Sequence, residues 1–138
     1  MNGLVSSLSA QGSLGYFLIR VLTGAILAIS GYSKLFIMGM NGTAGFFEKI
    51  GFPAPMVVGL FITALELFGG VLLIAGLLTR YVAVLFFVEF IVAAYVKWVV
   101  MTQGFTGARI DLMILASAIL FATNGAGSYS VDAKIGRG

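Results

Sequence analysis

The chain has 138 residues, of which 60% are hydrophobic and only 9% are charged, with a formal net charge of +3. Soluble domains carry about a quarter charged residues, so this composition excludes a soluble globular domain and indicates lipid as the surrounding medium. The basic residues are scattered, which argues against nucleic-acid binding. Neither Cys nor His occurs, so disulfides and thiol chemistry are excluded and we expect no metal site.

Four segments are long and apolar enough to cross a bilayer, at about 20 residues per span. They are residues 14–38, 56–78, 81–101 and 105–123. The later connections, at residues 79–80 and 102–104, are short enough to force antiparallel neighbours. The sequence therefore predicts an all-α fold, an antiparallel bundle of four transmembrane helices that forms one domain over residues 1–138.

The first connection, residues 39–55, contains four glycines and two prolines and cannot be one continuous helix. Within it, residues 44–50 are predicted to form a short helix that Thr43 caps and that Gly51 and Pro53 terminate. Its phenylalanines lie beside charged residues, a pattern typical of a helix in the membrane interface.

The orientation of the bundle does not follow from its charges. Four spans put both termini on one side, and the uncharged residues 1–13 lack the basic start of a cleaved signal, so we expect no cleavage. The basic residues divide evenly, with Arg20, Arg80, Lys134 and Arg137 toward the terminal side and Lys34, Lys49, Lys97 and Arg109 opposite. The positive-inside rule therefore gives a tie.

Five ionisable residues fall within the predicted spans, where each costs several kcal/mol unless it faces a partner or the bundle interior. They are Arg20, Glu66, Glu89, Lys97 and Asp111. Counting about 1.5 Å per residue from the terminal side puts Arg20 level with Glu89, and Glu66 level with Asp111. We therefore predict a polar strip in which Arg20 lies beside Glu89 and reaches toward Glu66, while Asp111 lies within reach of Lys97.

Three interpretations of this strip remain open. Buried ion pairs can fix which helix faces which, a purely structural role. Alternatively, the strip is a site for a quinone head group, a proton or another small ligand, because ionisable groups inside a membrane mark such sites. Finally, if the helix ends are misplaced, Arg20, Lys97 or Asp111 reaches the head groups by snorkelling.

Small residues form a second pattern. Gly24, Ala28 and Gly31 form one stripe of small residues along the first span, and Gly69 and Gly70 are small residues in the second. In lipid, such stripes favour close helix packing. A cofactor groove or a partner helix is the alternative use of the same stripe.

Several short motifs occur in a characteristic order between residues 20 and 132. They are Arg20, Gly31 with Lys34, Gly42-Thr43, Phe46-Phe47, Gly51-Phe52-Pro53, Glu66 with Gly69-Gly70, Gly76, Thr79-Arg80, Gly104-Phe105 and residues 125–132. Together they resemble the DoxX family of small four-helix membrane proteins. Family members often carry a His late in the third helix and a Glu opening the fourth. Here the corresponding residues are Lys97-Trp98 and Asp111, so any role of that His does not carry over.

The resemblance implies a membrane subunit of oxidoreductase systems, such as thiosulfate:quinone oxidoreductase. The leading hypothesis is an accessory or anchoring subunit in a prokaryotic cytoplasmic membrane, with the lipid bilayer and other membrane or redox subunits as partners. Its candidate ligand is a quinone or a lipid. The alternatives are a quinone-linked oxidoreductase subunit with an intramembrane carboxylate site, and a transporter of protons or small molecules. Without Cys or His, redox chemistry would belong to a bound cofactor or a partner.

Overall fold

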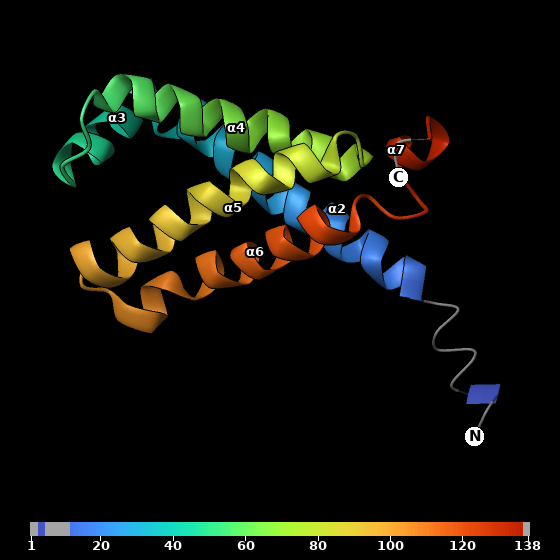
Figure 1. Ribbon diagram of the computed structural model, residues 1–138. Coiled ribbons are helices and arrows are strands. Elements are labelled where there is room, and N and C mark those ends of the chain that lie inside the picture. Colours follow the sequence, from blue (N-terminus) through green and yellow to red (C-terminus); the bar gives the residue numbers. More distant parts are fainter. Residues whose placement is uncertain (1–2, 5–11, 137–138) are drawn as a thin grey trace.

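The computed structural model describes residues 3–4 and 12–136 (Figure 1). Residues 1–2 and 5–11, where no cleavage is expected, and residues 137–138, which include Arg137, lie outside the described residues. The helices from residue 12 onward are α2 (Gly12–Tyr32), η1 (Ser33–Ile37), α3 (Gly39–Lys49), α4 (Pro55–Ala75), α5 (Thr79–Tyr95), η2 (Val96–Val100), α6 (Gly104–Asn124) and α7 (Val131–Lys134). No strand occurs among the described residues. The all-α prediction is confirmed.

Four helical stretches in the described part of the chain are long and apolar enough to cross a membrane. They are Leu14–Ile37, Pro55–Ala75, Thr79–Val100 and Gly104–Asn124. The shortest have 21 residues, a rise of about 31 Å that matches the hydrocarbon thickness of a bilayer. The chain is therefore a multi-pass membrane protein surrounded by lipid.

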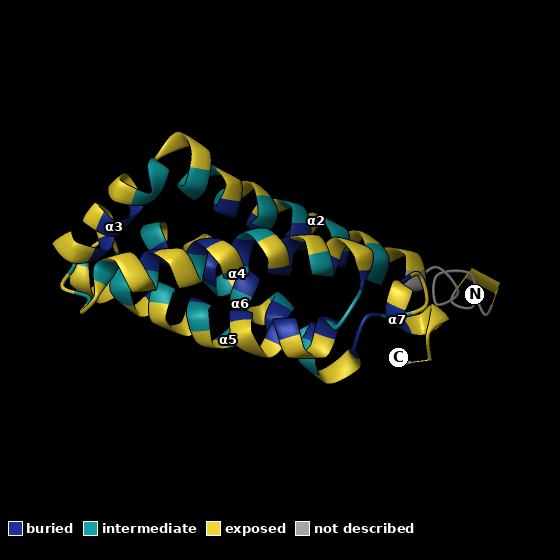
Figure 2. Cartoon of the chain, turned by 90° about the horizontal axis from the view of Figure 1, so that it is seen from above, coloured by how far each residue is buried: buried dark blue, intermediate teal, exposed yellow. Residues whose placement is uncertain are grey.

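The spans form two tightly packed pairs, α2 with α4 and α5 with α6. Figure 1 shows α4 and α5 meeting at their shared turn and diverging toward the end where α3 lies. In Figure 2 the buried residues line the inside of the bundle while exposed ones cover its outside. The apolar core joins the pairs, and Gly69 lets Phe86 approach so closely that a Cβ would lie 2.7 Å from its Cζ. The buried members of this apolar core are Leu27, Leu73, Val82, Ala83, Phe86, Phe90, Ile114, Ala118 and Phe121.

The contact between α2 and α4 is made by backbone atoms meeting across small residues. A Cβ on Gly70 would lie 2.5 Å from the nitrogen of Ala28 and 2.6 Å from the carbonyl oxygen of Gly24. A Cβ on Gly31 would lie 2.5 Å from the nitrogen of Leu67. Because these neighbours are backbone atoms, the helices would have to separate to admit a side chain.

The turn between α4 and α5 lies earlier than the sequence indicates. The prediction at residues 79–80 is wrong, because α5 already begins at Thr79 and the turn occupies residues 76–78. Gly76 and Leu78 both have positive φ, of 71° and 54°. The carboxylate of Asp132 accepts hydrogen bonds from the backbone nitrogens of Leu78 (3.0 Å) and Thr79 (3.1 Å). This remote cap fixes the start of α5, and local sequence gives no sign of it.

The helix in the first connection is longer than predicted, beginning at Gly39 instead of residue 44 and ending at Lys49. Thr43 does not cap it. Thr43 lies inside the helix with 1% of its surface exposed, and its hydroxyl donates to the carbonyl oxygen of Lys34 at 2.9 Å. A tertiary contact therefore uses the hydroxyl that the local pattern assigns to the cap.

Candidate intramembrane site

In the described part of the chain, two ion pairs lie within the bundle, one in each helix pair. Lys34, in η1, places its Nζ 2.7 Å from Oε2 and 3.2 Å from Oε1 of Glu66 on α4. Lys97, in η2, places its Nζ 2.9 Å from Oδ2 of Asp111 on α6. The side chains of the acids are only 6% and 4% exposed, while those of Lys34 and Lys97 are 24% and 38% exposed. Each pair thus buries its anion and leaves its cation accessible.

A third carboxyl group, that of Glu89 on α5, adjoins these pairs. Glu66, Lys34 and Asp111 are close enough to act on it electrostatically. Its Oε1 is buried and has no hydrogen-bond partner among the described residues. We call the set Lys34, Glu66, Glu89, Lys97 and Asp111 the polar cluster, which holds three carboxyl groups against two amines.

The structure brings together four of the five ionisable residues that the sequence singles out. These are Glu66, Glu89, Lys97 and Asp111. The predicted contact of Arg20 with Glu89 and Glu66 is wrong, and Lys34 takes its place. The count of basic residues places Lys34 on the side opposite the termini. Its position inside the first predicted span, residues 14–38, is the signal that points to the polar cluster.

Arg20 instead holds the terminal end of the bundle together. It is 1% exposed, and among the residues that the structure describes its guanidinium donates only to backbone carbonyl oxygens. Two of these bonds, to Leu73 on α4 and to Tyr129, measure 2.8 Å. The full set of acceptors is Leu73, Ile74, Ala126 and Tyr129. With every donor nitrogen engaged, Arg20 is not available to the polar cluster.

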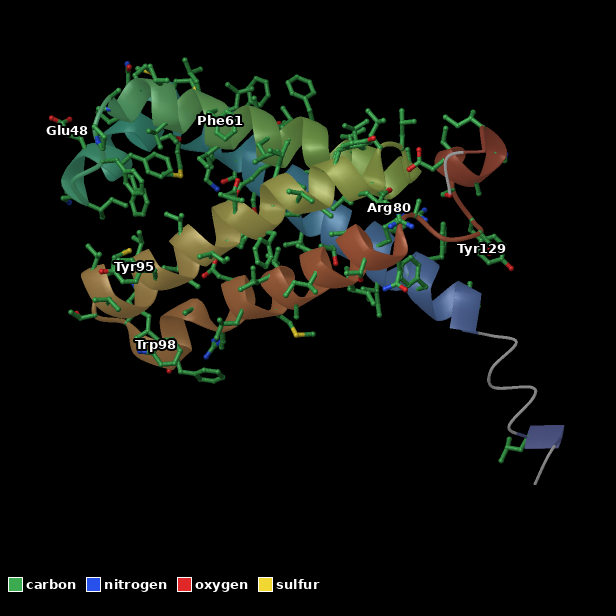
Figure 3. The ribbon with its side chains drawn as sticks, in the orientation of Figure 1. Glu48, Phe61, Arg80, Tyr95, Trp98 and Tyr129 are labelled. Carbon is green, nitrogen blue, oxygen red and sulfur yellow. The ribbon has the colours of Figure 1, made fainter. Side chains whose placement is uncertain are left out.

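Residues 125–134, which we call the C-terminal strap, also hold the terminal end of the bundle together. The hydroxyl of Tyr16 donates to the Gly125 carbonyl, and Ser130 caps α7 by accepting from the Ala133 nitrogen at 3.1 Å. Figure 3 shows Tyr129 of the strap at the same end of the bundle as Arg80. The carboxylate of Asp132, in the strap, accepts hydrogen bonds at the N-terminus of α5, and the guanidinium of Arg20 donates one near the C-terminus of α4. Helix dipoles favour an anion at an N-terminus and a cation at a C-terminus.

The Lys34–Glu66 pair predicts a measurable coupling. Glu66→Ala should lower the free energy of unfolding in detergent by about 3 kcal/mol, because it leaves the Lys34 ammonium without its anion inside the bundle. The double variant Lys34→Met with Glu66→Met should recover most of that loss, since no unpaired charge remains. Thermal unfolding of Glu66→Ala measures the loss, and that of Lys34→Met, Glu66→Met and the double variant measures the coupling. Unchanged stability in Glu66→Ala would exclude a structural role for the pair.

The chain is similar in sequence to several bacterial proteins over most of its length. The sequence model of the DoxX family matches residues 15–102. A Bacillus subtilis (strain 168) protein named "Putative oxidoreductase CatD" is 39% identical over 91% of this chain and 90% of its own length. "Uncharacterized membrane protein Rv3486" of Mycobacterium tuberculosis is 30% identical over 94% and 86%. "Inner membrane protein YphA" of Escherichia coli (strain K12) is 27% identical over 83% and 86%. No solved structure gives a significant match.

Proposed function

This chain belongs to the DoxX family of membrane proteins, and from that premise we propose that it is a membrane subunit of a prokaryotic oxidoreductase system whose polar cluster binds a quinone head group. The name of the Bacillus relative supports the link to redox chemistry. The bacterial membrane relatives, one of them named as an inner membrane protein, support a place in the cytoplasmic membrane. Its partners in this proposal are the lipid bilayer and redox subunits.

The polar cluster is the observation that carries the proposal. Two ion pairs, one for each helix pair, would be enough to fix how the helices face one another. Glu89 is in excess of that need, because both lysines already pair with other acids and its buried Oε1 has no hydrogen-bond partner in the described part of the chain. Ionisable groups inside a membrane are expensive and mark ligand or proton sites. An extra carboxyl group among accessible lysines therefore supports a site over a purely structural strip.

The cluster offers the groups that a quinone needs. A quinone head group has two carbonyl oxygens that accept hydrogen bonds, and the partly exposed amines of Lys34 and Lys97 are donors. Glu89, which lies close enough to Glu66 to act on it electrostatically, would hold and pass on a proton. When bound, the quinone would supply the redox chemistry, since the chain has neither Cys nor His.

The subunit role is supported by how little of the described chain lies outside the spans. Apart from the four spans, the larger elements are α3 and the C-terminal strap. Neither forms a separate domain, and no group of three or more His, Cys, Asp or Glu among the described residues could hold a metal ion. A further redox centre would therefore come from a partner protein.

Quinone binding can be followed with a probe that the chain already carries. Trp98, the chain's one tryptophan, is the neighbour of Lys97, and Figure 3 places it at the end of the α5–α6 pair away from the strap. We expect decylubiquinone or menadione to quench its fluorescence in the purified protein in mild detergent. Lys34→Met and Lys97→Met should each weaken binding about tenfold, because a hydrogen bond from a charged donor contributes about 1.5 kcal/mol or more.

The matched control is Lys49→Met, on α3, which should bind like wild type because Lys49 is exposed and outside the polar cluster. Quinone retained after purification from native membranes, measured by mass spectrometry, gives a second readout that does not depend on Trp98. Saturable quenching that all the variants share equally would place the quinone elsewhere. Absence of both quenching and retained quinone would overturn the quinone proposal. Copurifying redox proteins would support the subunit role, and their absence from native membranes would oppose it.

A further inference from the structure

Both lysines of the polar cluster lie in π-helical turns, the two such elements in the described part of the chain. The turns share a pattern, since Lys is the second residue of each and a Met follows each. The Met38 nitrogen bonds to the carbonyl oxygen of Ser33 at 2.9 Å, and the Met101 nitrogen to that of Val96 at 2.8 Å. π turns are rare and concentrate at functional sites, so their recurrence at both lysines indicates that they place these side chains.

In both turns the carbonyl oxygen of the lysine itself is bonded from the segment that follows. The oxygen of Lys97 accepts from the backbone nitrogen of Gln103 at 3.0 Å. The oxygen of Lys34 accepts from the side-chain hydroxyl of Thr43, on α3, at 2.9 Å. The two turns differ in the donor, because a side-chain hydroxyl bonds the Lys34 carbonyl in η1 and a backbone nitrogen bonds the Lys97 carbonyl in η2.

The position of Thr43 is itself fixed by packing. It is 1% exposed, and together with Ala44 and Phe47 it forms the buried face of α3. This face packs on α4, where a Cβ on Gly59 would lie 3.4 Å from Cγ2 of Thr43. With no access to water, the hydroxyl has little alternative to the carbonyl of Lys34.

We propose that Thr43 is a positioning residue, whose hydroxyl holds the η1 turn and so keeps Lys34 against Glu66. The inference deepens the proposed function and rests on it, because Lys34 matters for activity only if the polar cluster is the working site. It assigns to α3 the task of setting the geometry of a group inside the membrane. The contact itself, however, can be tested without any quinone.

The test compares Thr43→Val, which keeps the shape but removes the donor, with Thr43→Ser, which keeps the donor. Lysine amines of the purified full chain in detergent are acetylated with an N-hydroxysuccinimide ester, and the rate at each lysine is read by mass spectrometry. In Thr43→Val we expect Lys34 to react about fivefold faster, the factor that a net hydrogen bond of about 1 kcal/mol gives. Lys97 is the control within the same molecule and should keep its rate.

Thr43→Ser should react like wild type at both lysines. Thr63→Val is the matched control variant, because Thr63 is buried on α4 and its hydroxyl has no hydrogen-bond partner among the described residues. Equal acceleration at Lys34 and Lys97 would show a general loosening, and an unchanged Lys34 rate would show no positioning; either result overturns the proposal. If Thr43→Val fails to fold, Thr43→Ala is judged by the same ratio of rates. A rise confined to Lys34 would stand even if quinone binding were absent.

Discussion

Replacing Arg20 with Ala is expected to lower the free energy of unfolding by about 4 kcal/mol or more. The guanidinium bonds four carbonyl oxygens in a place with 1% exposure, and hydrogen bonds to charged groups contribute about 1.5–3 kcal/mol each. Losing them also detaches the C-terminal strap from α4. Thermal unfolding in mild detergent measures the stability, and limited proteolysis within residues 125–134 detects release of the strap.

Two control variants separate the bonds from the charge. Arg20→Lys keeps the charge but has fewer donors in another geometry, so its stability should lie between those of wild type and Arg20→Ala. Arg80→Ala removes an exposed arginine that contacts carbonyl oxygens at 3.1 and 3.5 Å, and its effect should be below about 1 kcal/mol. If Arg20→Ala were no more damaging than Arg80→Ala, the buried arginine would not hold the terminal end.

Gly70→Ala is expected to destabilise the bundle by about 3 kcal/mol, the upper part of the usual range for overpacking. The added methyl would lie 2.5 Å from the nitrogen of Ala28 and 2.6 Å from the oxygen of Gly24. Neither backbone atom can move aside unless α2 separates from α4, which also disturbs the helix pair that carries Lys34 and Glu66. Thermal unfolding in detergent measures the loss.

Gly15→Ala is the matched control, because Gly15 also lies in a span but a Cβ there would meet nothing within 4 Å. Its stability should be unchanged or higher by up to about 1 kcal/mol, since Ala is the better helix former. Equal stability of the two variants would mean that the close approach of α2 and α4 is not needed.

The spans could be predicted because composition and length alone determine them. The polar cluster could be predicted only in part. Helix counting gives the depth of a residue but not the direction it faces, and a π turn changes the count near its end, which is where Lys34 lies. The prediction for Arg20 is wrong for a different reason. Its acceptors are backbone carbonyls 53 to 109 residues away, and a backbone acceptor leaves no signature in the sequence.

The same limit applies to the capping residues. Thr43 precedes a stretch of phenylalanines and charged residues and fits the pattern of a helix cap. Its hydroxyl instead donates to the carbonyl oxygen of Lys34, in the preceding span. Asp132, in contrast, has no local reason to be singled out, although it caps the start of α5. In both cases a contact between segments distant in sequence outweighs the local preference.

The terminal closure has a consequence for how the molecule is assembled during synthesis. Two of the carbonyls that surround Arg20 belong to residues made 106 and 109 positions later, so this cation is synthesised well before its surroundings are complete. Before the strap is synthesised, Arg20 has only its acceptors on α4, the carbonyl oxygens of Leu73 and Ile74, or the lipid head groups as hydrogen-bond partners. The surroundings of Arg20 are therefore completed only after the strap has been synthesised and reaches the guanidinium.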